Sequence, residues 1–125
     1  MENSIKEAYS KIGRVWCPVL EDFVTFNRAG LQHLIRKRGI MRPKSEQRRR
    51  FALLRYAENI IKNPDAIVTH EIKNAELSPA EFWMFHREQD DIRITLTIRQ
   101  IGKGNKHFFS IYGDKIKTSP IQADF

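Results

Sequence analysis

The sequence predicts one α+β domain, in which N-terminal helices pack on one face of a four-stranded antiparallel sheet. Its 125 residues are enough for one compact hydrophobic core. The first half of the chain carries helical patterns, and residues 66–112 carry strand patterns separated by turns. This separation of helices from strands is typical of the α+β class. We therefore divide the chain into an N-terminal extension (1–21), a basic helical part (22–65), an antiparallel meander (66–112) and a tail (113–125).

The first half of the chain predicts helices with one strand between them. Residues 4–15 are weakly amphipathic, and residues 22–26 alternate as in a strand. Asn27 is a suitable N-cap for a helix over residues 28–38, which we expect to end at Gly39. Pro43 blocks continuation of that helix, and a second, longer helix is expected over residues 45–62.

The second half predicts the sheet. We expect four strands, over residues 66–72, 82–87, 92–101 and 107–112. Ser78, Pro79 and Glu81 form a helix-start signal directly before the second of these segments. The aromatic side chains of that segment, FWMFHR, favour a strand instead.

The segment IRITLTIRQI, residues 92–101, alternates between apolar and polar side chains, as in a strand with two different faces. The loop GKGN predicts a hairpin in which Ile101 pairs with Lys106. This register places three pairs of residues opposite each other: Arg99 and Phe108, Thr97 and Ser110, and Thr95 and Tyr112. Phe109 and Ile111 are then expected on the apolar face.

The opposite face of this sheet is expected to be polar. If residues 88–91 form the preceding turn, His86 lies opposite Arg93 on it. The expected members of this face are His86, Arg93, Thr95, Thr97, Arg99, Ser110 and Tyr112. Such a surface could hold a phosphodiester and move its protons. The alternative is an ordinary solvated face, because antiparallel sheets often leave one side in water.

The net charge of +7 is concentrated in one segment of the chain. Residues 28–55 contain ten lysines and arginines against a single acid, Glu46. This concentration favours a polyanionic partner, RNA or DNA first and an acidic protein second, over a merely soluble basic surface. The side chains that we expect to bind nucleic acid are Arg36, Lys37, Arg38, Arg48, Arg49, Arg50 and Lys106.

Several other classes of protein find no support in the sequence. No apolar run approaches the roughly 18 residues that cross a bilayer, so no membrane partner is expected. The single cysteine, Cys17, is compatible with a reducing compartment, and we expect a cytoplasmic protein. No cofactor or metal is expected, because histidines and acids are too sparse for a four-ligand site. A Gly-rich phosphate loop and a GxSxG motif are both missing from the sequence.

His33 lies in the basic segment GLQHLIRKRGIMRP, residues 30–43. At about 100° per residue it lies roughly 200° from Leu31, on the side of the helix away from the apolar stripe. His33 is therefore either a solvated surface residue or part of a cationic site. The neighbouring Arg36 and Lys37 should lower the pKa of His33 by like-charge repulsion. A neutral imidazole near pH 7 is able to accept a proton.

Three patterns together resemble one group of ribonucleases. They are the set Phe23, Gly30, His33 and Arg38, the segment NPDAI at residues 63–67, and FFSIY at residues 108–112. Over about residues 23–119 the chain is similar to the phage- and toxin-associated nucleases of the barnase, EndoU, colicin-tRNase and RelE-like group. The resemblance implies two N-terminal helices followed by a four-stranded antiparallel sheet.

The resemblance also implies a reaction, which is metal-independent cleavage of RNA by attack of a 2′-hydroxyl on the adjacent phosphate. Its site residues map onto His33 for proton transfer, Arg93 and Arg99 for charge stabilisation, Ser110 for a phosphate contact and Tyr112 as an aromatic hydroxyl. If the helix packs flat on the sheet, His33 points away from Ser110. The full site then closes only if the helix sits at the sheet edge, or if His86 or His107 takes the proton role. The implied substrate is tRNA, the implied protein partner is an acidic immunity protein or antitoxin, and the implied location includes the cytoplasm of a target cell.

Two functions without catalysis stay open on the sequence. One is a nucleic-acid-binding module that uses the same basic surface. The other is an adaptor whose basic helix docks an acidic protein. Cleavage of RNA in the presence of a chelator would separate the enzyme from both.

Overall fold

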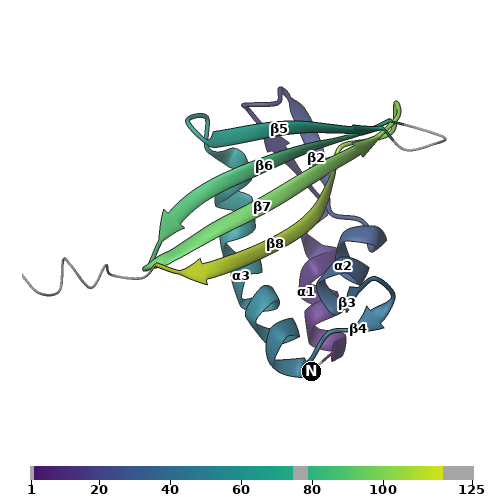
Figure 1. Cartoon of the computed structure of the whole chain (residues 1–125), viewed down its shortest axis with the longest axis vertical. Helices are drawn as coiled ribbons and strands as arrows, with labels where there is room; N and C mark the ends of the chain where they lie inside the picture. The colour runs from purple at the N-terminus through teal and green to yellow at the C-terminus, as the bar shows by residue number, and fades with distance from the viewer. Residues whose placement is uncertain (1, 75–78, 117–125) are drawn as a thin grey trace, which may run out of the picture.

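The computed structural model describes residues 2–74 and 79–116, within which the chain forms three helices and eight strands (Figure 1). The elements are α1 (Glu2–Ile12), β1 (Arg14–Cys17), β2 (Asp22–Thr25), α2 (Arg28–Ile35), β3 (Arg36–Lys37), β4 (Ile40–Met41), α3 (Lys44–Lys62), β5 (Ile67–Asn74), β6 (Pro79–Gln89), β7 (Ile92–Ile101) and β8 (His107–Lys115). Ser78 of the helix-start signal lies outside the described residues, and the segment after it is a strand. In the described part of the chain, no helix is long and apolar enough to cross a bilayer.

The predicted four-stranded antiparallel sheet is wrong, because the main sheet has six strands and mixed pairing. Its strand order is β1-β2-β8-β7-β6-β5, and it curls into a half-barrel. The predicted meander, β5 to β8, forms the antiparallel part of this sheet. A separate sheet of two strands is formed by β3 and β4.

The two extra strands come from the N-terminal part of the chain. The segment RVWC at β1 alternates between exposed and buried residues and pairs with β2 in a hairpin. This hairpin joins the meander through parallel pairing of Thr25 with His107, where the Thr25 N–H donates to the Lys106 carbonyl at 2.9 Å. Val15 and Cys17 are buried, so the first 21 residues contribute both to the sheet and to the core.

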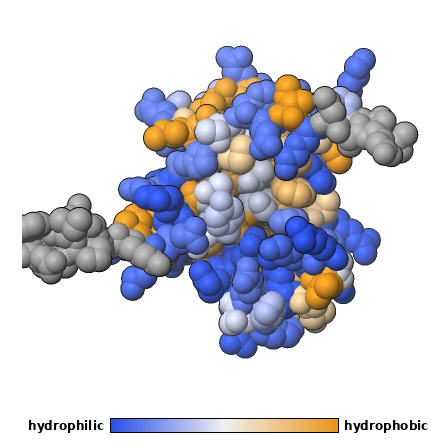
Figure 2. Space-filling model, viewed as in Figure 1, coloured by the Kyte–Doolittle hydropathy of each residue, from blue (hydrophilic) through white to orange (hydrophobic). Residues whose placement is uncertain are grey.

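The core lies between the helices and one face of the curled sheet (Figure 1). Its buried side chains include Leu34, Ile60 and Ile61 from the helices and Phe85, Leu96, Ile98, Phe108 and Ile111 from the strands. Tyr9 adds α1 to this core, with its ring edge-on to Phe26 and Phe108. The other face of the sheet is turned toward the viewer in Figure 2, where its middle has intermediate hydropathy and mainly hydrophilic residues, with some hydrophobic ones, surround it.

The helix α2 is shorter than predicted. Asn27 caps it as expected, since its side-chain oxygen accepts a hydrogen bond from the Gly30 N–H at 3.1 Å. The helix ends at Ile35 and not at residue 38, because Arg36 has extended backbone angles and begins the β3–β4 hairpin. The turn of this hairpin has positive φ at Arg38 and Gly39. Residues 36–41 are all exposed, so the hairpin projects from the domain beside α2 (Figure 1).

The predicted pairing of β7 with β8 is correct for its middle part. Thr97 lies opposite Ser110, as expected, and Thr95 lies opposite Tyr112. On the other side of β7, His86 pairs with Thr95 and not with Arg93. The reason is that the turn before β7 is tighter than predicted, with only Asp90 and Asp91 between the strands.

Beyond Thr97 the predicted register is wrong because β8 contains a β-bulge. Arg99 lies opposite His107 instead of Phe108. Phe109 is the extra residue, and its ring contacts Phe82, which lies opposite Arg99 on the polar face. The bulge therefore turns Phe109 onto the polar face, where the sequence pattern did not place it.

Candidate functional site

A glycine lets α2 approach β8 closely. A Cβ at Gly30 would overlap both the Phe108 carbonyl oxygen and the Tyr9 hydroxyl. The Tyr9 hydroxyl donates to the Asn27 carbonyl at 2.7 Å, which holds α1 against the start of α2. Because α2 sits this close, its next turn brings His33 onto the bulge of β8.

His33 packs against the bulged residue Phe109, with 4.4 Å between the ring centroids. The imidazole is partly buried, and its Nδ1 atom is closed to solvent without a hydrogen-bond partner among the described residues. The pKa of His33 is lowered to about 4, first by burial and then by the charges of Arg42, Arg50, Arg99 and Lys37. The direction agrees with the sequence-based expectation, but burial is the larger cause. The imidazole is therefore neutral at pH 7.

Arg99 reaches the same phenylalanine from β7. Its guanidinium carbon lies 4.3 Å from the centroid of the Phe109 ring, and its Nε donates a hydrogen bond to His107 Nε2 at 3.0 Å. His107 Nδ1 lies 3.4 Å from the Asn105 carbonyl oxygen, so a neutral tautomer with the proton on Nδ1 satisfies both contacts. Burial lowers the pKa of His107. His107 therefore orients Arg99, and both of its ring nitrogens are engaged.

Two further arginines make the surroundings of His33 positive. The buried Arg42 donates from Nε to the His33 carbonyl at 3.1 Å. Arg50 donates to the Ile111 carbonyl of β8 at 3.3 Å. Both guanidiniums share the carboxylate of Glu46, at 3.5 Å from Arg42 and 3.2 Å from Arg50. One carboxylate thus balances two cations, and an excess of positive charge remains.

The structure brings His33 and Arg99 together but separates Arg93 from them. Arg93 is six residues from Arg99 along β7, which corresponds to about 20 Å, and it forms an ion pair with Glu88 at 3.0 Å. Arg93 and Arg99 are therefore too far apart to hold one phosphate. Ser110 directly follows the bulge, but its side chain is buried against the neighbouring strand.

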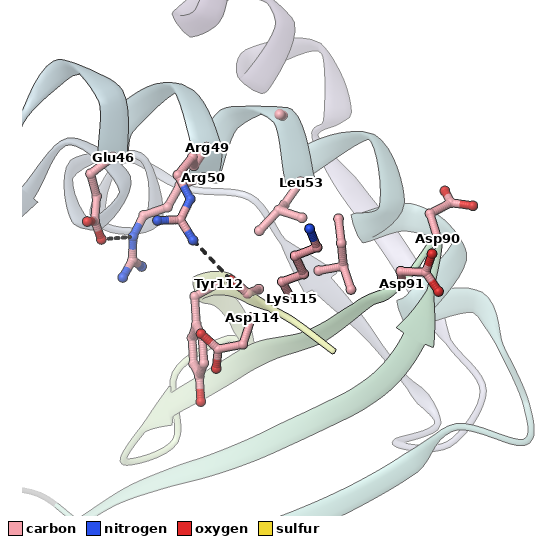
Figure 3. A pocket seen from close by; sticks show the side chains of 12 residues that line it. Glu46, Arg49, Arg50, Leu53, Asp90, Asp91, Tyr112, Asp114 and Lys115 are labelled. Atoms are coloured by element: carbon pink, nitrogen blue, oxygen red, sulfur yellow. Dashed lines mark hydrogen bonds and ion pairs between the residues drawn. The ribbon is translucent and has the colours of Figure 1, made fainter. Parts of the chain in front are cut away.

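Tyr112 is exposed and lines an adjacent groove of about 670 Å³ between α3 and the end of β8 (Figure 3). Charged side chains of both signs surround the groove: Glu46, Arg49, Arg50, Asp90, Asp91, Asp114 and Lys115. Arg49 donates to the Gly113 carbonyl at 3.5 Å, so arginines of α3 cover the free edge of β8. The mixed charge makes this groove less suited to a phosphate than the surroundings of His33.

The side chains predicted to bind nucleic acid lie in three places. Arg36, Lys37 and Arg38 are exposed on the β3–β4 hairpin, next to His33, and Arg48 and Arg49 are exposed on α3. Arg50 has only 15% of its side chain exposed, because of its contacts with β8. Lys106 forms an ion pair with Asp22 at 2.9 Å and lies over the Trp83 ring, so it joins β2 to the meander.

His86 is the remaining alternative for proton transfer. Its Nε2 lies 2.9 Å from the Thr69 hydroxyl, and it is opposite Thr95, four residues and about 14 Å from Arg99. Within residues 2–74 and 79–116, no three His, Cys, Asp or Glu side chains cluster closely enough to hold a metal ion. Phe109 and Arg42 are the members of the site that sequence reasoning missed. Two adjacent phenylalanines before a serine give no signal of a bulge.

Comparisons of the chain with protein-family models, with curated proteins and with solved structures find no match. The function is therefore inferred from the geometry of this site.

Proposed function

We propose that this protein is a metal-independent endoribonuclease, in which His33 accepts the proton and Arg99 binds the phosphate. The observation that carries the proposal is the neutral, partly buried imidazole with an unpaired nitrogen inside a cluster of cations. An unpaired buried polar atom costs about 1–3 kcal/mol, so this histidine is not explained by stability. A neutral base beside a guanidinium is the combination that 2′-hydroxyl attack on a phosphate needs.

A phosphodiester held by Arg99 would place a negative charge near His33. That negative charge offsets the surrounding positive charges, and it therefore raises the pKa of the imidazole toward neutral pH. His33 then accepts the proton of the 2′-hydroxyl at Nε2, because Nδ1 is closed to solvent. The O2′–P bond forms while the P–O5′ bond breaks, and the leaving 5′-oxygen takes a proton from water. The products are a 2′,3′-cyclic phosphate and a 5′-hydroxyl.

The guanidinium of Arg99 stabilises the charge that develops on the phosphate oxygens, and His107 positions it through the 3.0 Å hydrogen bond. The sequence resemblance to toxin-associated ribonucleases only suggests which substrate and partner to test, because the four-stranded sheet that it implies is not the observed one. The proposal accordingly includes tRNA as the first substrate to test, a cytoplasmic site of action and an acidic immunity protein or antitoxin as partner.

Incubation of total RNA and of tRNA with the protein in EDTA, followed by mapping of the new ends, tests the proposal. We expect cyclic-phosphate ends, and we expect His33→Ala to slow cleavage roughly 10²- to 10⁴-fold, the usual effect of losing a general base. Arg93→Ala is the matched control, because Arg93 lies far along β7 in a surface ion pair. It should cleave like the wild type. Intact RNA with the wild-type protein, or normal cleavage by His33→Ala, would contradict the proposal.

The second candidate is a nucleic-acid-binding module without catalysis. The observation that favours it is the exposed basic hairpin at residues 36–41, which needs no chemistry to attract a phosphate backbone. This candidate predicts RNA binding with a steep salt dependence and no cleavage. An adaptor for an acidic protein predicts neither RNA cleavage nor specific RNA binding.

A further inference from the structure

Two large aromatic side chains stand exposed on the β1–β2 hairpin. Trp16 is 46% exposed and Phe23 is 40% exposed, and their rings meet edge to face at 5.1 Å between centroids. The guanidinium of Arg14, also exposed, lies 4.2 Å from the centroid of the Phe23 ring. These three side chains, here named the Trp16–Phe23 platform, combine aromatic faces with a positive charge.

The platform lies on the same face of the sheet as Arg99. Phe23 is two residues from Thr25, so both side chains point to one face, and Thr25 pairs with His107, which contacts Arg99. Val24 lies between Phe23 and Thr25 and is buried in the core, which confirms this alternation. Asp22 and Lys106 point the other way and meet in an ion pair beside Trp83, on the face that packs against the core.

The distance between the two features suits neighbouring nucleotides of one strand. Two residues along β2 and one step between strands separate Phe23 from His107, which corresponds to about 8 Å. A phosphate at Arg99 would therefore leave the base of an adjacent nucleotide within reach of the platform. Stacking requires an open base face, which a base inside a duplex does not offer.

We propose that the Trp16–Phe23 platform stacks an unpaired base of the RNA whose phosphate is bound at Arg99, so that the protein selects single-stranded RNA. This inference rests on the proposed function for the identity of the ligand as RNA. Charge complementarity supports it, because Arg14 at the platform and the cations around His33 attract a phosphate backbone. Arg14 also makes this patch less suited to a purely apolar partner.

The test uses a short single-stranded 2′-O-methyl oligouridine, which cannot be cleaved because its 2′-oxygen is blocked. A fluorescent label at one end reports binding by anisotropy, and the same strand annealed to its complement is the duplex competitor. We expect Trp16→Ala to weaken binding of the single strand roughly 10-fold, the effect of losing one stacked base, while Trp16→Phe keeps most of the affinity. Ile72→Ala is the matched control, since Ile72 is an exposed apolar residue on β5, at the opposite edge of the sheet.

A second measurement does not depend on the affinity of a variant. In a Trp83→Phe protein, Trp16 is the remaining tryptophan, and its emission should be quenched by the single strand and not by the duplex. Circular dichroism checks that each variant is folded. Equal affinity of Trp16→Ala and the wild type would overturn the inference, and so would equal quenching by the duplex.

The failure of this inference and that of the proposed function give different results. If Trp16-dependent binding is found but unmodified RNA stays intact, the platform stands and the nuclease proposal fails. If RNA is cleaved and Trp16→Ala leaves KM unchanged, the nuclease proposal stands and the platform fails. If the wild type binds no oligonucleotide at all, the inference is overturned, and the patch is to be tested as a protein-docking surface.

Discussion

The imidazole of His33 fills the space beside Phe109 while one of its nitrogens lacks a partner. A phenylalanine at this position would keep a ring contact and remove the unpaired nitrogen. We expect His33→Phe to abolish cleavage and to raise the free energy of unfolding by about 1 kcal/mol, measured by urea denaturation. His33→Ala should instead lower it by about 1 kcal/mol or more, because it leaves a space against Phe109. A destabilised His33→Phe protein would mean that Nδ1 has a partner in solution.

His107 affects the proposed phosphate contact indirectly, because it positions Arg99. His107 accepts the hydrogen bond of Arg99 and is itself buried, so it fixes the direction of the guanidinium. The register expected from the sequence put Phe108 opposite Arg99, which would leave Arg99 without this partner. The bulge supplies the partner, because it moves every residue before Phe109 by one position relative to β7.

The approach of α2 to β8 depends on Gly30, and its replacement separates two opposing effects. Alanine is favoured over glycine in a helix by about 1 kcal/mol, so propensity alone predicts that Gly30→Ala stabilises the protein. Packing predicts the reverse, because the added Cβ would overlap the backbone of Phe108. We expect packing to win, with a loss of about 1–3 kcal/mol in thermal or urea unfolding and slower RNA cleavage as His33 is displaced. A stabilised Gly30→Ala protein with full activity would show that α2 moves freely against β8.

The arginines of α3 have different roles despite their adjacent positions. Arg48 and Arg49 are exposed, whereas Arg50 is largely buried between Glu46 and the Ile111 carbonyl. We expect Arg48→Glu with Arg49→Glu to weaken RNA binding and to reduce the slope of log affinity against log salt by roughly one unit for each lost phosphate contact. Stability should change little. Unchanged binding and slope would move the interaction surface away from α3.

Arg50→Glu is the informative contrast to that pair. It removes the hydrogen bond to β8 and places a second carboxylate beside Glu46. The protein should therefore lose stability, so the three arginines are not one interchangeable cationic run.

The pH dependence of stability belongs to the whole molecule, because it sums over every titratable group whose pKa differs between the folded and the unfolded chain. The pKa of His33 is lowered to about 4, and that of His107 is lowered as well, mainly by burial. Between about pH 6.5 and pH 4 the unfolded chain therefore binds more protons than the folded protein, and stability falls as the pH falls. The contribution of His33 is fully present above pH 6.5 and is lost on the way down to pH 4.

We expect this loss to be about 2 kcal/mol smaller in His33→Phe than in the wild type, measured by urea unfolding at pH 7 and pH 4.5. The measurement compares each protein with itself at the two pH values, so the separate effect of the substitution on packing cancels. An identical pH dependence in both proteins would show that His33 titrates normally in the folded state.

The curled sheet is what assembles the site from distant parts of the chain. Its strand order places β8 between the N-terminal hairpin and β7, so β8 contacts residues from both ends of the domain. The helices α2 and α3 then close over β8 from the core side, and His33 reaches past its bulge. The proposed site, the platform at Trp16 and the exposed hairpin at residues 36–41 all depend on this arrangement.

Much of the local structure could be predicted from the sequence by itself. Asn27 caps α2, residues 44–62 form a helix almost as expected, and Thr97 lies opposite Ser110. The strand at FWMFHR also forms, in spite of the helix-start signal before it. These features depend on residues close in sequence, through helix caps, strand alternation and short turns. The local sequence pattern is therefore enough to predict them.

Only the tertiary structure decided the six-stranded sheet, the early end of α2 and the bulge at Phe109. The parallel pairing of Thr25 with His107 joins residues far apart in the chain, and no local sequence pattern predicts it. The same holds for Phe109, whose apolar side chain suits either face until His33 and Arg99 pack against it. A sequence pattern shows which side chains prefer burial, but which surface buries them depends on segments that meet only in the folded chain.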